Sequence, residues 1–162
     1  MPEEPEEFEE FDIPPPFLDG EMPQITEPGE PIEVVVEGVF LAENKQDVQR
    51  FVLLSDGDRK LPIQIGAPEA AAINYCLDGV QPDRPMTHEL LRTVIERLEG
   101  KVVRVVIDDI WKSTYYAKLY IKPSGKDPEM EIDCRPSDAI ALALKFEAPI
   151  YVCENVLVQG AS

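Results

Sequence analysis

The sequence has few cysteines, one histidine and no long apolar run. Its three cysteines lie far apart in the 162-residue chain and form no C-x-x-C pair. We therefore expect free thiols, because the spacing suits neither a disulfide framework nor a zinc site. Apolar runs such as residues 102–107 are too short to cross a bilayer, so no membrane partner is expected. No basic stretch followed by an apolar one opens the chain, which predicts a cytoplasmic protein without a secretory signal.

Basic residues are also scarce, since 15 lysines and arginines stand against 32 acidic residues and the net charge is -17. The first 31 residues hold 11 of the acidic residues, eight prolines and no basic residue. Such a segment buries too little apolar surface to fold, so residues 1–31 are predicted to be a disordered acidic tail. The rest of the chain keeps 21 acidic residues against all 15 basic ones, a net charge near -6. That balance is compatible with weak, salt-sensitive binding of nucleic acid.

Several common catalytic motifs are absent from the sequence. It contains no P-loop, no G-x-G-x-x-G, no H-E-x-x-H and no G-x-S-x-G pattern. Nucleotide hydrolysis on a P-loop, dinucleotide redox chemistry, zinc proteolysis and serine hydrolysis therefore lack support. Carboxylate chemistry on phosphodiesters is still compatible with the residues present.

Hydrophobic periodicity predicts seven short strands and three helices in one domain, residues 32–157, followed by a short tail, residues 158–162. The strands are expected at residues 32–42, 48–54, 59–65, 101–110, 114–122, 130–135 and 150–153. The helices are expected between Pro68 and Gly79, after Thr87 as the N-cap up to Gly100, and from Pro136 to Glu147. Gly38 predicts a β-bulge, and Pro62 predicts either an edge strand or a local break in the ladder.

The two halves of the domain repeat the same pattern of three strands and a proline-started helix. At a constant offset, the apolar positions and one carboxylate of the first half fall on those of the second: Leu61, Ile63, Ile65 and Glu69 on Met130, Ile132, Cys134 and Asp138. The sequence therefore predicts an α+β fold built from a duplicated βββα unit. We expect a compact mixed sheet with helices packed on it and a pseudo-two-fold axis between the units.

Charged residues gather where the strand of residues 130–135 meets its helix. Alternation places Asp133 and Arg135 on one face of a half-buried strand, with Cys134 on the apolar face. Asp138 follows in the first turn of the helix. These groups and the free backbone N–H groups could bind a phosphate or a metal and exchange protons. Alternatively, Asp138 only caps its helix and Arg135 pairs with Asp133.

Only the second unit keeps this full set of charged residues, because Gln64 and Gly66 stand where the second unit has Asp133 and Arg135. The site then belongs to one copy, or it is shared across the axis and Glu69 is the contribution of the first copy. If Glu69, Asp133 and Asp138 converge, they could hold a divalent cation such as magnesium.

His88, the only histidine, is expected in the first turn of the second helix beside Thr87. The positive end of a helix favours the neutral imidazole, which suits a general base. The alternative is an ordinary surface histidine.

Four segments of the sequence carry a resemblance to a known family. They are Leu61–Gly66 with Glu69–Ala70, Arg84–Leu91, Asp133–Ala143 and Ala148–Val152. In this order and spacing they resemble the bifunctional nuclease domain family, over roughly residues 32–157. The resemblance implies a compact α+β domain with nuclease activity toward both RNA and DNA.

The polar members of the matching segments are the candidate site residues. We expect Glu69, His88, Asp133 and Asp138 as catalytic candidates, and Thr87, Arg135 and Ser137 as substrate-binding candidates. The alternative to a nuclease is a non-enzymatic scaffold whose charged junction binds an anion or a partner. On either hypothesis we expect a homo-oligomer, because open sheet edges gain by being covered. Trp111, Tyr115, Tyr116 and Tyr120 form either its interface or ordinary strand packing.

Overall fold

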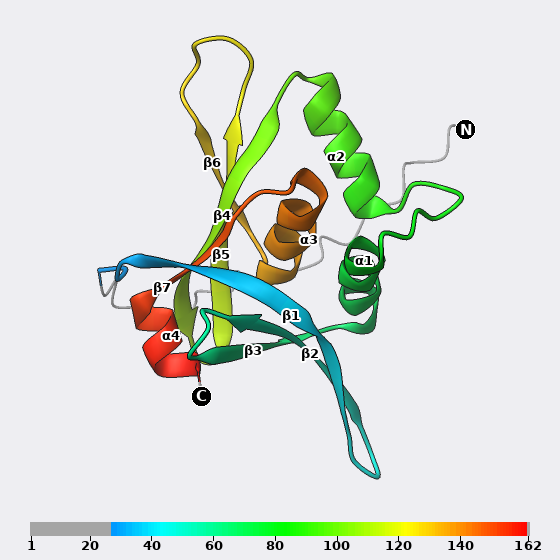
Figure 1. Cartoon of the computed structure of the whole chain (residues 1–162), viewed down its shortest axis with the longest axis vertical. Coiled ribbons are helices and arrows are strands. Elements are labelled where there is room, and N and C mark those ends of the chain that lie inside the picture. The colour runs from blue at the N-terminus through cyan, green and yellow to red at the C-terminus, as the bar shows by residue number, and fades with distance from the viewer. Residues whose placement is uncertain (1–26, 162) are drawn as a thin grey trace, which may run out of the picture.

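The computed structural model describes residues 27–161, which form one seven-stranded mixed sheet and four helices (Figure 1). The strands are β1 (Pro31–Glu43), β2 (Val48–Ser55), β3 (Lys60–Ile65), β4 (Lys101–Trp111), β5 (Thr114–Lys122), β6 (Met130–Cys134) and β7 (Ile150–Cys153). The helices are α1 (Ala67–Asp78), α2 (Thr87–Arg97), α3 (Pro136–Phe146) and α4 (Glu154–Gly160). The predicted α+β class is confirmed. Residues 1–26 of the predicted acidic tail lie outside the described part of the chain.

The strand order β3-β2-β1-β7-β4-β5-β6 places the last strand between the two repeated units. Neighbouring strands are antiparallel, except that β7 runs parallel to β4. β1 and β4 therefore run in opposite directions on the two sides of β7. A two-fold axis between the units β1–β2–β3–α1 and β4–β5–β6–α3 produces this arrangement, as the duplication predicts. In Figure 1 the β1–β2 turn and the β5–β6 turn project at opposite ends of the molecule.

Helices α1 and α3 pack against each other and connect the two units. Both are rich in alanine, which has the highest helix propensity and lets two helix backbones approach closely. Ala70 and Ala72 of α1 are buried, and Ala139, Ala141 and Ala143 of α3 are fully buried. The Cys76 thiol of α1 lies 3.8 Å from the Ala141 carbonyl oxygen of α3. Because each helix begins directly after the third strand of its unit, this close packing brings two strand-to-helix junctions together.

Two local predictions about the first unit are confirmed. The register of β1 against β2 shifts between Val36 and Gly38, which is the expected bulge. Pro62 lies in β3, an outer strand of the sheet, where a residue without an N–H group is tolerated.

The N-cap of α2 was predicted one residue too late. The cap is Met86, and Thr87 is the first helical residue. The Glu89 carboxylate accepts a hydrogen bond from the Met86 N–H at 2.9 Å. This side chain, three residues into the helix, satisfies the backbone N–H group of the cap residue.

Other expectations about burial and length are also corrected. The strand β6 is not half-buried, because it is the second outer strand and α3 packs mainly against β4 and β5; only Cys134 is partly covered. Residues 158–160, expected in a short tail, form the end of α4, which the sequence analysis did not predict. No helix within residues 27–161 is long and apolar enough to cross a membrane.

Candidate functional site

The site lies where the N-termini of α1 and α3 meet. The N-caps are Gly66 for α1 and Arg135 for α3, and both have an extended backbone. Glu69 and Asp138 are each the third residue of their helix, so they occupy equivalent positions in the two units. With α1 and α3 packed together, one carboxylate from each unit reaches the same guanidinium, that of Arg135.

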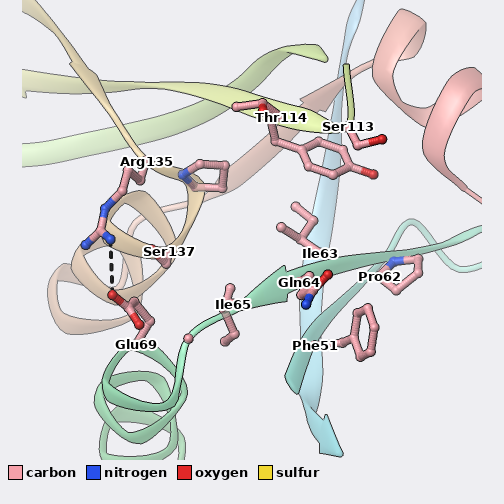
Figure 2. A pocket seen from close by; sticks show the side chains of 13 residues that line it. Phe51, Pro62, Ile63, Gln64, Ile65, Glu69, Ser113, Thr114, Arg135 and Ser137 are labelled. Atoms are coloured by element: carbon pink, nitrogen blue, oxygen red, sulfur yellow. Dashed lines mark hydrogen bonds and ion pairs between the residues drawn. The ribbon is translucent and has the colours of Figure 1, made fainter. Parts of the chain in front are cut away.

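Arg135 is held from two sides by these carboxylates. Its Nε and Nη2 donate to Oδ2 and Oδ1 of Asp138 at 3.0 and 3.2 Å. Its Nη1 donates to Oε1 of Glu69 at 3.1 Å, the contact drawn in Figure 2. A guanidinium has five N–H donors, so these contacts within the described residues use three and leave two for a ligand. The hydrogen bonds to Asp138 and Glu69 raise the pKa of Arg135, which stays positively charged.

His88 joins the cluster through Asp138. Its Nε2 lies 3.0 Å from Oδ1 of Asp138, and its side chain is only 12% exposed. In the tautomer that donates from Nε2, Nδ1 is left as a proton acceptor. A carboxylate that orients an imidazole in this way is a recurring device for general-base catalysis.

Asp138 is the centre of the cluster and remains ionised. Burial alone would raise its pKa, but the hydrogen bonds from Arg135 and His88 outweigh burial and lower the pKa of Asp138 below its ordinary value. The ionised carboxylate therefore accepts hydrogen bonds from both partners at once. Together, Glu69, Arg135, Asp138 and His88 form one connected network, which we call the junction cluster.

Gly66 provides the space that Glu69 occupies. A Cβ atom at residue 66 would overlap Oε2 of Glu69, the far end of a flexible side chain. Gly66 is also the residue equivalent to Arg135 in the duplication. The first unit thus has no side chain where the second unit supplies its guanidinium, and the carboxylate of Glu69 folds back over this gap.

Two hollows border the junction cluster. The larger is a groove of about 550 Å³, bounded by β3 and the start of α1 on one side and by the β4–β5 turn and the start of α3 on the other (Figure 2). The smaller, about 170 Å³, lies between the starts of α1, α2 and α3, and His88 is one of the residues that line it. Glu69 and Arg135 line both hollows, so their ion pair stands between the groove and the histidine.

Comparison with known proteins identifies the family. Residues 52–162 match the family model of the bifunctional nuclease domain. The chain belongs to this family. An uncharacterized protein of Mycobacterium tuberculosis is 40% identical over 128 residues, which cover 79% of this chain and 75% of that protein.

Two plant relatives carry the family name. "Bifunctional nuclease 1" of Oryza sativa subsp. japonica is 31% identical over 106 residues, or 64% of this chain and 32% of that protein. "Bifunctional nuclease 2" of Arabidopsis thaliana is 28% identical over 93 residues, or 57% of this chain and 28% of that protein. The matched region is about a third or less of each plant protein.

Asp133, a candidate in this bifunctional nuclease domain, lies outside the junction cluster. Its side chain is 78% exposed and lies 3.6 Å from Lys118, its neighbour across β5 and β6. The alternative that Arg135 only pairs with Asp133 is therefore wrong. Strand alternation turns Asp133 toward Lys118, whereas Arg135, as N-cap of α3, turns toward the helices.

The remaining candidates border the two hollows. Ser137 is buried and lines the groove, and Thr87 is exposed beside the small pocket. The carboxylate set proposed for a divalent cation does not come together, because Asp133 lies apart and Arg135 stands between Glu69 and Asp138. Residues 27–161 contain no group of three or more His, Cys, Asp or Glu side chains placed to hold a metal ion.

Cys134, the thiol next to the cluster, is not activated. Burial raises its pKa to about 11, and the nearby Asp138 and Asp133 carboxylates add to this effect. A thiol with such a pKa is almost entirely protonated near neutral pH. Cys134 is therefore poorly suited to act as a nucleophile.

Four residues of the groove lining lie outside the segments that resemble the family. Phe51, Ser113, Thr114 and Tyr115 come from two hairpins far apart in the chain, and no motif marks them. Glu69, Arg135 and Ser137 of the lining are candidate residues from the sequence, and Gln64 is marked there only as the first unit's equivalent of Asp133.

Proposed function

We propose that this domain hydrolyses phosphodiester bonds of RNA and DNA at the junction cluster. The observation that carries the proposal is the connected chain of His88, Asp138 and Arg135, in which Arg135 lies at the edge of an open groove. It joins an oriented proton acceptor to a fixed cation, which are two groups that phosphodiester hydrolysis uses. Membership of the bifunctional nuclease domain family supports the proposal.

Each residue of the cluster has a proposed role. Arg135 binds the phosphate through its two remaining donors and stabilises the charge that builds up in the transition state. His88 removes a proton from the attacking water while an oxygen–phosphorus bond forms and the bond to the leaving oxygen breaks. The leaving oxygen then takes a proton from the imidazolium or from solvent. Asp138 orients His88 and Arg135, and Glu69 holds the other side of the guanidinium.

Arg135 need not lose its partners to bind a phosphate. Should a substrate compete with Glu69 for Nη1, the cost is small, because an exposed ion pair contributes only about 0–1 kcal/mol. The Arg135 side chain is 64% exposed and therefore meets this condition.

The test is cleavage of RNA and DNA oligonucleotides by wild-type protein and by Asp138→Asn, His88→Ala and Arg135→Ala, with and without magnesium. Loss of general-base catalysis typically costs about 10²- to 10⁴-fold, so we expect rates to fall at least about 100-fold in His88→Ala. Asp138→Asn should fall similarly, because the imidazole loses its orienting carboxylate.

Asp133→Asn is the matched control. Asp133 belongs to the same sequence segment as Asp138, but its exposed carboxylate pairs with Lys118 outside the cluster. This variant should keep its rate within about twofold, since surface substitutions change little. Equal rates in Asp138→Asn and wild type, with both proteins folded by circular dichroism, would instead favour a non-enzymatic anion-binding scaffold.

A further inference from the structure

We propose that the 550 Å³ groove beside Arg135 is a nucleobase-binding subsite. The substrate unit at this site is then a nucleotide whose base is unpaired and inserted between β3 and the β4–β5 turn. This inference rests on the proposed function in one respect, the assignment of Arg135 to the phosphate. It assigns a binding site to the base, the part of the substrate that the junction cluster does not contact.

The shape of the groove supports this assignment. Figure 2 shows Arg135 and Glu69 at one end and Phe51 and Pro62 at the other. A volume of about 550 Å³ lies within the range of small-molecule sites, roughly 300–1,000 Å³. A phosphate held by Arg135 would therefore leave the sugar and base of the same nucleotide to extend along the groove.

The lining of the groove matches the chemistry of a base, which has apolar faces and a polar edge. Phe51 and Tyr115 contribute partly buried aromatic rings, and stacking of bases on aromatic rings is a general mode of single-strand recognition. The exposed amide of Gln64 offers both donors and an acceptor, the combination that pairs with adenine in other complexes. Ser113 and Thr114 add hydroxyl groups from the opposite wall.

An extended peptide is the main competing occupant, because β3 is an outer strand and exposed strand edges can accept another strand. Pro62 argues against this occupant. It lies in the middle of β3 and has no N–H group, so it interrupts the row of donors that strand addition uses. The guanidinium at one end of the groove favours a phosphate-bearing ligand instead.

The experiment compares the binding of adenosine 5′-monophosphate, ribose 5-phosphate and inorganic phosphate to the full-length protein by titration calorimetry. The three probes share the phosphate and differ in the sugar and the base. Wild type should bind adenosine 5′-monophosphate about tenfold or more tightly than ribose 5-phosphate, as expected for one stacked base. Phe51→Ala should remove most of this preference, and Gln64→Ala, a change at an exposed position, should reduce it.

Tyr120→Ala is the control, because Tyr120 is a partly buried aromatic residue of β5 outside the groove, stacked on Arg104. It should keep the preference for the base. Equal affinity of wild type for adenosine 5′-monophosphate and ribose 5-phosphate would overturn the inference. So would binding of a Thr-Val repeat peptide along β3 in place of the nucleotide, seen in the amide resonances of that strand.

The binding test is separate from the test of catalysis. If the protein prefers the base-bearing probe but cleaves no oligonucleotide, the nuclease proposal fails and the subsite stands. If it cleaves oligonucleotides but binds adenosine 5′-monophosphate and ribose 5-phosphate equally, the subsite fails and the nuclease proposal stands.

Discussion

At the scale of single residues, Gly66 allows the position of Glu69 to be tested without changing a charge. In Gly66→Ala, the new methyl group would overlap Oε2 of Glu69 and force the carboxylate away from Arg135. The φ of Gly66 is -79°, which alanine adopts readily. We therefore expect the free energy of unfolding to change by less than about 1 kcal/mol. The KM for an oligonucleotide should rise several-fold with little change in kcat, because Arg135 loses one of its two supports.

A double-substitution cycle decides whether this effect runs through Glu69. Gly66→Ala and Glu69→Gln act on the same contact, so their combination should be no worse than the more harmful single change. If the two substitutions raise KM additively, Gly66→Ala must act on the groove independently of Glu69, for example by shifting the start of α1.

Sequence patterns identified all four residues of the junction cluster but not the geometry of the site. The duplication predicted that Glu69 and Asp138 are equivalent, and the observed N-caps, Gly66 and Arg135, fall at the same offset. The sequence could not predict that His88 approaches Asp138, because this depends on how α2 packs beside α3. The sequence also wrongly placed Asp133 in the site. Alternation shows which residues share a face of a strand, but not which face lies toward the helices.

At the scale of elements, α2 carries an apolar stripe that the core covers only in part. Ile95 is 7% exposed, whereas Leu98 is 76% exposed and Leu90, Leu91 and Val94 are also exposed. Ile95→Ala should lower the free energy of unfolding by about 2–5 kcal/mol, as buried isoleucine truncations do. Leu98→Gln should change it by less than about 0.5 kcal/mol. Chemical denaturation at two protein concentrations measures both values.

A concentration-dependent loss of stability in Leu98→Gln would contradict this expectation. It would mean that a second copy of the chain covers the stripe in solution, at a surface other than the sheet edges on which the expected homo-oligomer rests. Periodicity shows that a helix has an apolar face but not what packs on it.

At the scale of the whole molecule, charge should control the approach of nucleic acid. Residues 1–26 hold nine acidic residues and no basic one, so a chain that begins at Glu27 has a net charge of -8 in place of -17. We expect this shortened chain to bind a fluorescent oligonucleotide several-fold more tightly in 20 mM salt, because it repels the phosphates less. Fluorescence anisotropy measures the difference.

Salt provides the control for this charge effect. Near 0.5 M salt the screening length falls to roughly 4 Å, and the two proteins should then bind alike. A difference that persists at high salt would instead indicate that residues 1–26 act through direct contacts with the domain or the oligonucleotide.

The place of β7 at the centre of the sheet has a consequence for how the chain folds. Ile32 of β1 pairs with Val152 of β7, and Val105 of β4 pairs with Ile150 of β7. Neither unit can therefore complete its hydrogen bonding until β7 is in place. Each three-stranded unit can form from local hairpins, but joining the units requires closing a loop of about 120 residues, which is slow. During synthesis, β1 therefore stays without its central neighbour until residues 150–153 have been made. The sheet is completed last at its middle.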